Sequence, residues 1–159
     1  MALFIKFAGV EGECKDSQHT GWSDLLSMSW GLHRPGGGTT GVQSRTGTAT
    51  VDDIVISKAF DKASPKLAEM VLSGKVFPKV EIHNTATFGA NRCVYLKYVL
   101  ENVAVTSHNV GATNDDTVPP HESFSLNFQK VTKTYTEYDA NGSKKGNVEM
   151  TWNVEAGTK

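Results

Sequence analysis

The dominant pattern along the chain is an alternation of apolar and polar residues with a period of two. It begins at residues 3–7 and recurs at residues 25–33, 79–83, 94–108, 122–138 and 148–154. Side chains of a β-strand point alternately to opposite faces, so the pattern predicts strands with one buried and one wetter face. Val, Ile, Thr, Tyr, Phe and Trp fill these runs, as they do in strands. The sequence therefore predicts a mainly β protein.

Two of these runs change phase in the middle. The apolar positions switch from even to odd numbers between Leu100 and Val103, and again between Phe128 and Val131. A β-bulge shifts the phase of a strand by one residue and bends the strand toward closure of the sheet. Long bent strands are typical of barrels and strongly coiled sandwiches, so we expect one of these architectures.

One helix interrupts the strands. Ser64 suits the N-cap position and Pro65 the first helical position. Apolar residues then follow at spacings of three and four, which gives a single apolar stripe. Gly74 suits the position after the last turn. These features predict a helix at residues 65–73 that covers one end of the β structure.

The loops are also marked in the sequence. Residues 34–47 are rich in glycine and lack an apolar pattern, which predicts a long flexible excursion. The triple glycine at residues 36–38 lacks the lysine and the following helix of a phosphate-binding loop. Asn141-Gly142 favours a tight hairpin turn. No linker or second core is recognisable, so we expect a single domain over residues 1–159.

Composition limits the possible partners. The 159 residues include 16 Lys and Arg against 17 Asp and Glu, a formal net charge of -1, which argues against nucleic-acid binding. No run approaches the roughly 18 apolar residues of a membrane span, so we expect no membrane insertion. The N-terminal residues do not have the pattern of a secretory signal. Two isolated cysteines are typical of reduced thiols in a cytoplasmic protein.

Candidate chemistry is sparse. The five histidines are not spaced with one another or with a cysteine as zinc ligands are, so we expect no metal. No serine elbow is present, and the sequence places no base beside Cys14 or Cys93. Asp52 and Asp53 are neighbours on a strand and point to opposite faces, which argues against a catalytic pair. We therefore expect no catalytic residue, no cofactor and no enzyme activity.

The strand predicted at residues 25–33 has an unusual wetter face. After its first residue this face consists of Ser27, Ser29, Gly31 and His33, where Lys and Glu would be normal for solvent exposure. Small neutral side chains suit a smooth surface against another molecule. We therefore expect Ser27, Ser29 and Gly31 to line a channel or an interface. A near-zero net charge agrees, because identical subunits then repel one another little.

Short segments over nearly the whole chain match the pattern of a known family. They are Phe4-Ile5-Lys6, Gly12-Glu13-Cys14-Lys15-Asp16 with His19, Ser29-Trp30-Gly31, the run from Lys58 to Leu67, Gly74-Lys75 with Pro78, Tyr95-Leu96 with Leu100, Leu126-Asn127-Phe128 and Trp152-Asn153. In these segments and their order the chain resembles the Hcp family, the hemolysin-coregulated proteins that form the inner tube of type VI secretion systems. Cys14 stands where the family commonly has Ser.

The resemblance implies a phage tail-tube-like fold, a small β-barrel of two sheets with one α-helix packed alongside. It implies homohexameric rings that stack into a tube inside contractile sheath proteins, with a spike protein at the tip. It also implies effector proteins in the lumen, and export from the cytoplasm to the extracellular space or a target cell without a signal peptide.

The resemblance also implies roles for two regions of this chain. Ser27, Ser29 and Gly31 match the region that lines the lumen. The loop at residues 34–47 matches the family's extended loop, which reaches a neighbouring subunit or ring. The contact residues implied are Arg34, Pro35, Gly36, Gly37, Gly38, Thr39, Thr40, Gly41, Val42, Gln43, Ser44 and Arg45.

The sequence also allows two other interpretations. A monomeric β-barrel that binds a small ligand or a sugar would need a concave pocket lined by aromatic residues. Trp30 and Trp152 lie in the apolar phase of their strands, which favours core packing, whereas Trp22 is ambiguous. A hydrolase would use Cys93 or Cys14 as its nucleophile, although Cys93 lies at a strand start where packing explains it.

Overall fold

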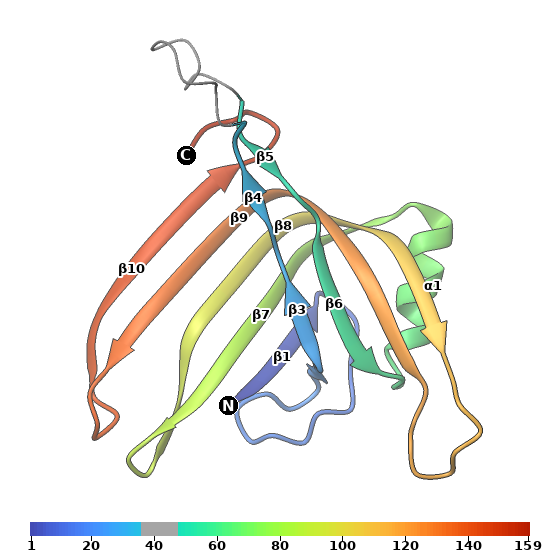
Figure 1. Cartoon of the computed structure of the whole chain (residues 1–159), viewed down its shortest axis with the longest axis horizontal. Helices are drawn as coiled ribbons and strands as arrows, with labels where there is room; N and C mark the ends of the chain where they lie inside the picture. Colours follow the sequence, from blue (N-terminus) through green and yellow to red (C-terminus); the bar gives the residue numbers. More distant parts are fainter. Residues whose placement is uncertain (36–47) are drawn as a thin grey trace.

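The computed structural model describes residues 1–35 and 48–159. Strands and one helix are joined by tight turns and by longer segments (Figure 1). In chain order they are β1 (Ala2–Phe7), β2 (Ser23–Asp24), β3 (Ser27–Ser29), β4 (Leu32–His33), β5 (Thr50–Val51), β6 (Ile54–Ala59), α1 (Ser64–Ser73), β7 (Val76–Phe88), β8 (Asn91–Gly111), β9 (His121–Tyr138) and β10 (Lys144–Asn153). The mainly β class and the helix predicted from the sequence are confirmed.

A curled sheet of eight strands makes up most of the described structure. Its strand order is β2-β1-β7-β8-β9-β6-β3, and β10 pairs with the other half of β9. β4 and β5 form a separate two-stranded sheet. Figure 1 shows the long strands arching over into a half-barrel, with α1 beside one end of the arch. The two sheets expected from the sequence are therefore present, and they are very unequal in size.

The arch follows a crease across three neighbouring strands. The pairing passes over Pro78 on β7, Asn102 on β8 and Gln129 on β9, which lie opposite one another. Proline has no N–H to donate to a ladder, and Asn102 has a positive φ of 50°. The Asn102 side chain donates a hydrogen bond of 2.8 Å to Gln129 Oε1. Buried positions change at this line from even to odd numbers on β8 and β9, and from odd to even numbers on β7.

The predicted bulges at these phase changes are therefore wrong. The register between β7 and β8, and between β8 and β9, continues unchanged across the crease, so no strand has an extra residue there. True register shifts lie elsewhere, at Asn84/Thr85 on β7 and at Val105/Ser107 on β8. The phase change lies where the pairing passes over one residue in each of three neighbouring strands, and the pattern within a single strand does not distinguish this from a bulge.

Helix α1 begins one residue earlier than predicted. Its cap residue is Ala63, and no side chain caps the helix, so the predicted N-cap role of Ser64 is wrong. The Asp61 carboxylate accepts a hydrogen bond of 3.0 Å from the N–H of Ala63. Gly74 ends the helix with a positive φ of 69°, as its position in the sequence predicts. Leu67 is fully buried against the sheet.

The strand predicted at residues 25–33 is broken in the structure. β3 covers only Ser27–Ser29, and β4 belongs to the small second sheet. Gly31 lies between them, where its carbonyl accepts a hydrogen bond from the N–H of Asp52 at 3.1 Å. A Cβ at Gly31 would lie 2.7 Å from Asp52 Oδ2, so a side chain there would displace the exposed Asp52 carboxylate. The Asn141-Gly142 hairpin turn is confirmed.

Candidate functional site: a serine-lined sheet face

Four neighbouring strands present small polar side chains on one face. The register aligns Ser27 with Ser57, Ser123 and Asn109, and it aligns Ser29 with Val55, Ser125 and Ser107. Cross-strand partners share a face, and the alternate residues of β6 and β9 are buried on the other side. We call these eight residues the serine face; each is exposed or partly exposed. None of them is charged.

The register shift in β8 shapes the border of the serine face. Thr106 is the residue passed over at this shift, and its hydroxyl donates to Asp53 Oδ2 at 3.0 Å. Asn127 Nδ2 donates to the other oxygen of Asp53 at 2.9 Å. Ser107 Oγ donates to Ser125 Oγ at 2.8 Å. Neutral donors therefore hold the bordering carboxylate, and the hydroxyls bond to one another.

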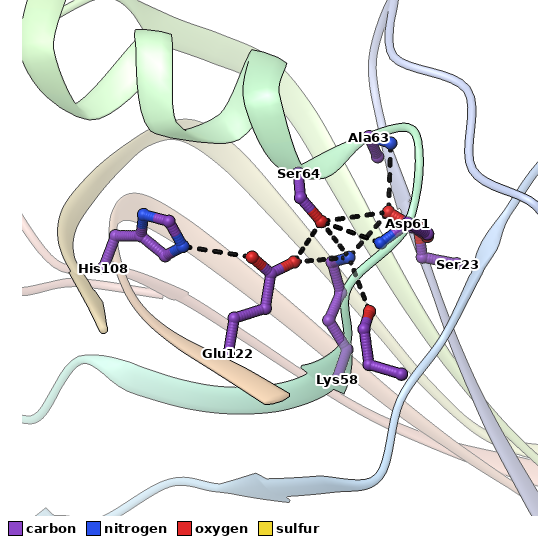
Figure 2. A network of polar contacts seen from close by, with 8 residues as sticks. Ser23, Lys58, Asp61, Ala63, Ser64, His108 and Glu122 are labelled. Atoms are coloured by element: carbon purple, nitrogen blue, oxygen red, sulfur yellow. Dashed lines mark hydrogen bonds and ion pairs between the residues drawn. The ribbon is translucent and has the colours of Figure 1, made fainter. Parts of the chain in front are cut away.

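Behind the serine face lies a buried network of charged groups (Figure 2). Lys58 is completely buried, with Nζ 2.7 Å from both Asp61 Oδ1 and Glu122 Oε1. Ser64 Oγ also lies 3.0 Å from the Lys58 ammonium and bonds to the Glu122 carboxylate. Nε2 of His108 lies 3.0 Å from Glu122 Oε2. Buried charges persist when they are paired and hydrogen-bonded in this way.

This network joins elements that are distant in the sequence. Ser23 of β2 donates to Asp61 Oδ2 at 2.8 Å, while Lys58 comes from β6, Ser64 from α1 and Glu122 from β9. Burial alone raises the pKa of Asp61, but hydrogen bonds from Lys58 and Ser23 outweigh burial and hold that pKa below its ordinary value. The helix and four strands are thus fixed to one another under the serine face.

The residues predicted to form the site lie in three places. Ser27 and Ser29 belong to the serine face, whereas Gly31 lies outside β3 at the close approach to Asp52. Arg34 and Pro35 are exposed. The predicted contact residues 36–45 lie outside the described residues.

Sequence reasoning missed most of the serine face. Ser57 on β6, Ser107 and Asn109 on β8, and Ser123 and Ser125 on β9 join it through pairing. The alternation of these residues with apolar residues indicates which face of a strand they occupy. It does not indicate which strands pair, because sequence periodicity gives the face of a residue but not its cross-strand neighbour.

The structure also contains a groove of the kind that a ligand-binding barrel would need. Its volume is about 210 Å³, and it lies where the small second sheet meets β9 and β10. Trp30, Trp152, Met150 and Leu32 are among its lining residues. Trp30 Nε1 is already used, because it donates to the Asp52 carbonyl at 3.0 Å. A sugar site needs several converging polar groups, and this lining is mainly apolar.

Of the two cysteines, Cys14 does not have the surroundings of a nucleophile. Both are free, and Cys14 is buried with its thiol 3.5 Å from Asp24 Oδ1. Burial, together with the nearby Asp24 carboxylate, raises the pKa of the Cys14 thiol, whereas a reactive cysteine needs a lowered pKa. Among residues 1–35 and 48–159, no group of His, Cys, Asp and Glu has the geometry of a metal site.

Comparison with known proteins shows which family this chain belongs to. The family model described as "Type VI secretion system effector, Hcp" matches residues 4–135. Protein hcp1 of Pseudomonas aeruginosa is 33% identical over 154 residues, which cover 96% of this chain and 94% of that protein. No helix in the described part of the chain combines the length and the apolar character needed to cross a membrane.

Solved structures agree with the sequence comparison. A structure of a type six secretion system protein superposes with a TM-score of 0.89 at 28% identity, covering 99% of this chain and 98% of that one. The crystal structure of Hcp1 from Salmonella typhimurium gives a TM-score of 0.81 at 24% identity, with coverage of 99% and 97%. The curled half-barrel with one attached helix is thus a fold found among type VI secretion proteins. The chain belongs to the Hcp family, whose members are secreted tube or effector proteins of that system.

Proposed function

We propose that this protein is a structural subunit of the type VI secretion inner tube, which acts as a homohexameric ring. The observation that carries the proposal is the serine face, whose eight residues are small or neutral across four strands. A wall of such side chains presents hydrogen-bonding groups but no fixed charge of its own. In this proposal the face lines the lumen, and Ser27 and Ser29 contact the cargo.

The strand edges on either side of the serine face support ring formation. β3 is the last strand of its sheet, and among the described residues no strand pairs with its outer edge. On the opposite border, β7 pairs with β8 only up to Ala104, which leaves the edge of residues 105–111 without a strand on that side. Two unlike edges on one subunit suit a head-to-tail contact, and such contacts close into rings.

The predicted contact loop has a defined role in this proposal. Residues 34–45 reach from one subunit to a neighbouring subunit or ring, and Arg34 and Pro35 begin this stretch at the exposed end of β4. Stacked rings then form the tube inside the contractile sheath, with a spike protein at the tip. Small effector proteins travel in the lumen, and the tube leaves the cytoplasm for the extracellular space or a target cell.

The action of such a subunit requires no bond to be made or broken. Its contribution is geometric: edges that join copies and a smooth wall that leaves a passage. The buried Lys58 network joins three of the four strands of the wall, β6, β8 and β9, behind the serine face. We accordingly propose a non-enzymatic role over residues 1–159 as a single Hcp-like tube domain.

Native mass spectrometry and negative-stain electron microscopy of the purified full chain test the proposal. The expected result is a particle of six copies with a central hole. A solitary 17.2 kDa species at high protein concentration, with no annular particles, contradicts it. That outcome favours the monomeric binding module, whose groove between Trp30 and Trp152 is then tested by ligand titration.

A further inference from the structure

Two histidines are buried together on a part of the structure that the serine face does not use. His19 belongs to the segment 8–22 between β1 and β2, and His83 lies on β7 opposite Phe4 of β1. Their side chains are only 2% and 13% exposed. Both lie on the face of β1 and β7 that points away from Ile5 and Ile82 of the main core.

The two rings are part of a chain of hydrogen bonds. Nδ1 of His19 lies 2.9 Å from Asp16 Oδ1, and because a carboxylate only accepts, this nitrogen carries a proton. Nε2 of His19 lies 3.0 Å from Nδ1 of His83, so a single proton lies between the two rings. Nε2 of His83 is buried 3.3 Å from Glu81 Oε2, without the geometry of a hydrogen bond.

The histidines also hold the segment 8–22 on the sheet by ring packing. His19 stacks on Phe4 with ring centres 4.2 Å apart and planes inclined by 10°. Trp22 packs on His83 at 4.5 Å and on His19 at 4.8 Å. Asp16 adds an ion pair with Arg92 of β8. The ring contacts of this segment with the sheet therefore converge on the pair His19–His83.

Charged and titratable groups surround the pair from every element packed against it. They are Cys14 and Asp16 in the segment, Asp24 on β2, Lys6 on β1, Lys79 and Glu81 on β7, and Arg92 and Lys97 on β8. Positive charges at Arg92 and Lys97 oppose a second proton on the rings, whereas Glu81 favours it. Burial therefore decides whether the rings take up a second proton, since neither ring can be fully hydrated while the segment is in place.

We propose that the His19–His83 pair is an acid-sensitive latch, and that full protonation of both rings releases the segment 8–22 from the outer face of β1 and β7. When both rings are protonated, hydrogens on the two facing nitrogens point at each other across 3.0 Å, and the bond between the rings is lost. Release uncovers the aromatic surface of Phe4 and Trp22, which the closed segment keeps packed.

The direction of the pH dependence follows from His83. Burial, reinforced by the charge of His19, lowers the pKa of His83 from 6.5 to about 4. When the segment is released, the His83 ring on β7 is hydrated and regains its ordinary pKa, so the released state binds more protons between pH 6.5 and 4. From pH 7 to pH 5 the equilibrium constant for release therefore increases roughly 20-fold. Asp16 and Glu81 do not account for the change between pH 7 and 5, because the pKa values of both carboxyl groups lie below their ordinary range. The hydrogen bond from His19 lowers the pKa of Asp16. Burial raises the pKa of Glu81, but Lys79 and Lys97 together outweigh burial and lower it.

Hydrogen exchange of the full chain, corrected for the intrinsic exchange rate at each pH, tests the latch. We expect protection of peptides within residues 8–22 to fall roughly 20-fold from pH 7 to pH 5, while β6 and β9 peptides keep their protection. His83→Gln removes the titrating ring and should flatten this dependence. His33→Gln is the matched control, since the His33 side chain is 60% exposed. It should leave the dependence unchanged.

Two results overturn the proposal. One is parallel loss of protection in the segment and in β6 and β9, which shows global acid unfolding. The other is an unchanged pH dependence in His83→Gln. If that variant does not fold, NMR titration of the wild-type histidine rings decides instead. A His83 midpoint below pH 5, followed by the amide shifts of the segment, supports the latch, and a midpoint above pH 6 overturns it.

Discussion

At the scale of single residues, Lys58 is the side chain whose surroundings are the most demanding. It is completely buried, and its ammonium lies between the Asp61 and Glu122 carboxylates at 2.7 Å from each. Removing one partner of such a group leaves uncompensated charge in the core, which costs more than the intact pair contributes. The network therefore adds little to the net free energy of unfolding, but it strictly limits which residues can occupy these positions.

Replacing this lysine should consequently be severe. We expect Lys58→Met to lower the free energy of unfolding by about 3–5 kcal/mol, because Asp61 and Glu122 then face each other without a cation. Urea unfolding at fixed protein concentration measures the loss. Lys62→Met is the control: its side chain is 54% exposed and 3.8 Å from Glu11, so its effect should be within about 1 kcal/mol.

The pH dependence of the Lys58→Met variant provides a second check. Burial raises the pKa of Asp61, and Lys58 is the first of the groups that hold it down, so without the lysine the folded variant binds protons more readily than wild type. Its deficit relative to wild type should therefore shrink as the pH falls toward 4. An equal deficit at pH 7 and pH 4.5, or equal losses in the Lys58 and Lys62 variants, would show that the network is not the cause.

Ser29 tests the serine face at the same scale. Ser29→Gln lengthens an exposed side chain on β3 and should change the free energy of unfolding by less than about 0.5 kcal/mol. In a ring it projects six longer side chains into the bore, so effector proteins that co-purify with the wild-type ring should be reduced. Mass spectrometry of the purified particles measures this. Ser73→Gln on the exposed end of α1 is the control, and equal retention in both variants would exclude Ser29 from the lumen wall.

At the scale of elements, the segment 8–22 depends on a glycine for its shape. The N–H of Gly12 donates to the Gly21 carbonyl at 2.8 Å, and the Cys14 N–H donates to the Trp22 carbonyl at 2.9 Å. A Cβ on Gly12 would lie 2.3 Å from the Trp22 carbonyl oxygen, which is backbone and has little room to move. Glycine is thus required at this position by a close approach of two chain segments.

Gly12→Ala should therefore loosen this element. We expect a loss of about 1–3 kcal/mol in the free energy of unfolding, the usual range for overpacking. Thermal unfolding followed by circular dichroism measures it. Gly146→Ala on β10, where a Cβ meets nothing within 4 Å, is the matched control and should remain close to wild type. A comparable loss in both variants would show that the contact with the Trp22 carbonyl is not its cause.

Much of the element structure could be predicted from the sequence, because it depends on local pattern. The alternation of Val80 and Ile82 with charged residues identifies a buried strand face, and Gly74 identifies the helix end. The N-cap prediction for Ser64 is wrong because its hydroxyl forms hydrogen bonds with Lys58 and Glu122 in the core instead. Tertiary hydrogen bonding there outweighs the local capping preference.

The remaining features require partners that are distant in the chain. Ser125 alternates with Phe124 and Leu126, but only its pairing with Val55, which itself pairs with Ser29, places it in one row with Ser29 on the serine face. The same holds for the Lys58–Glu122 pair, whose members are 64 positions apart in sequence number. Such contacts follow from strand order, which periodicity does not encode.

At the scale of the whole molecule, the proposed assembly makes the loop at residues 34–47 a separable part. Deletion of residues 36–40 should weaken rings or their stacking while each subunit stays folded. Native mass spectrometry and electron microscopy measure assembly, and circular dichroism measures folding. An equal shortening at residues 112–116, in the exposed turn between β8 and β9, is the control. Assembly that is equally stable in both variants would exclude a contact role for the loop.

The crease through Pro78, Asn102 and Gln129 has a consequence for changes in chain length. In each long strand the alternation of buried and exposed side chains changes phase by one residue at the crease. One residue inserted on the far side of Gln129 would turn Val131 outward and its polar neighbours inward, whereas two would restore the original orientation. Length variation in these strands should therefore be tolerated in even steps, and the two arms of the arch can diverge in length independently.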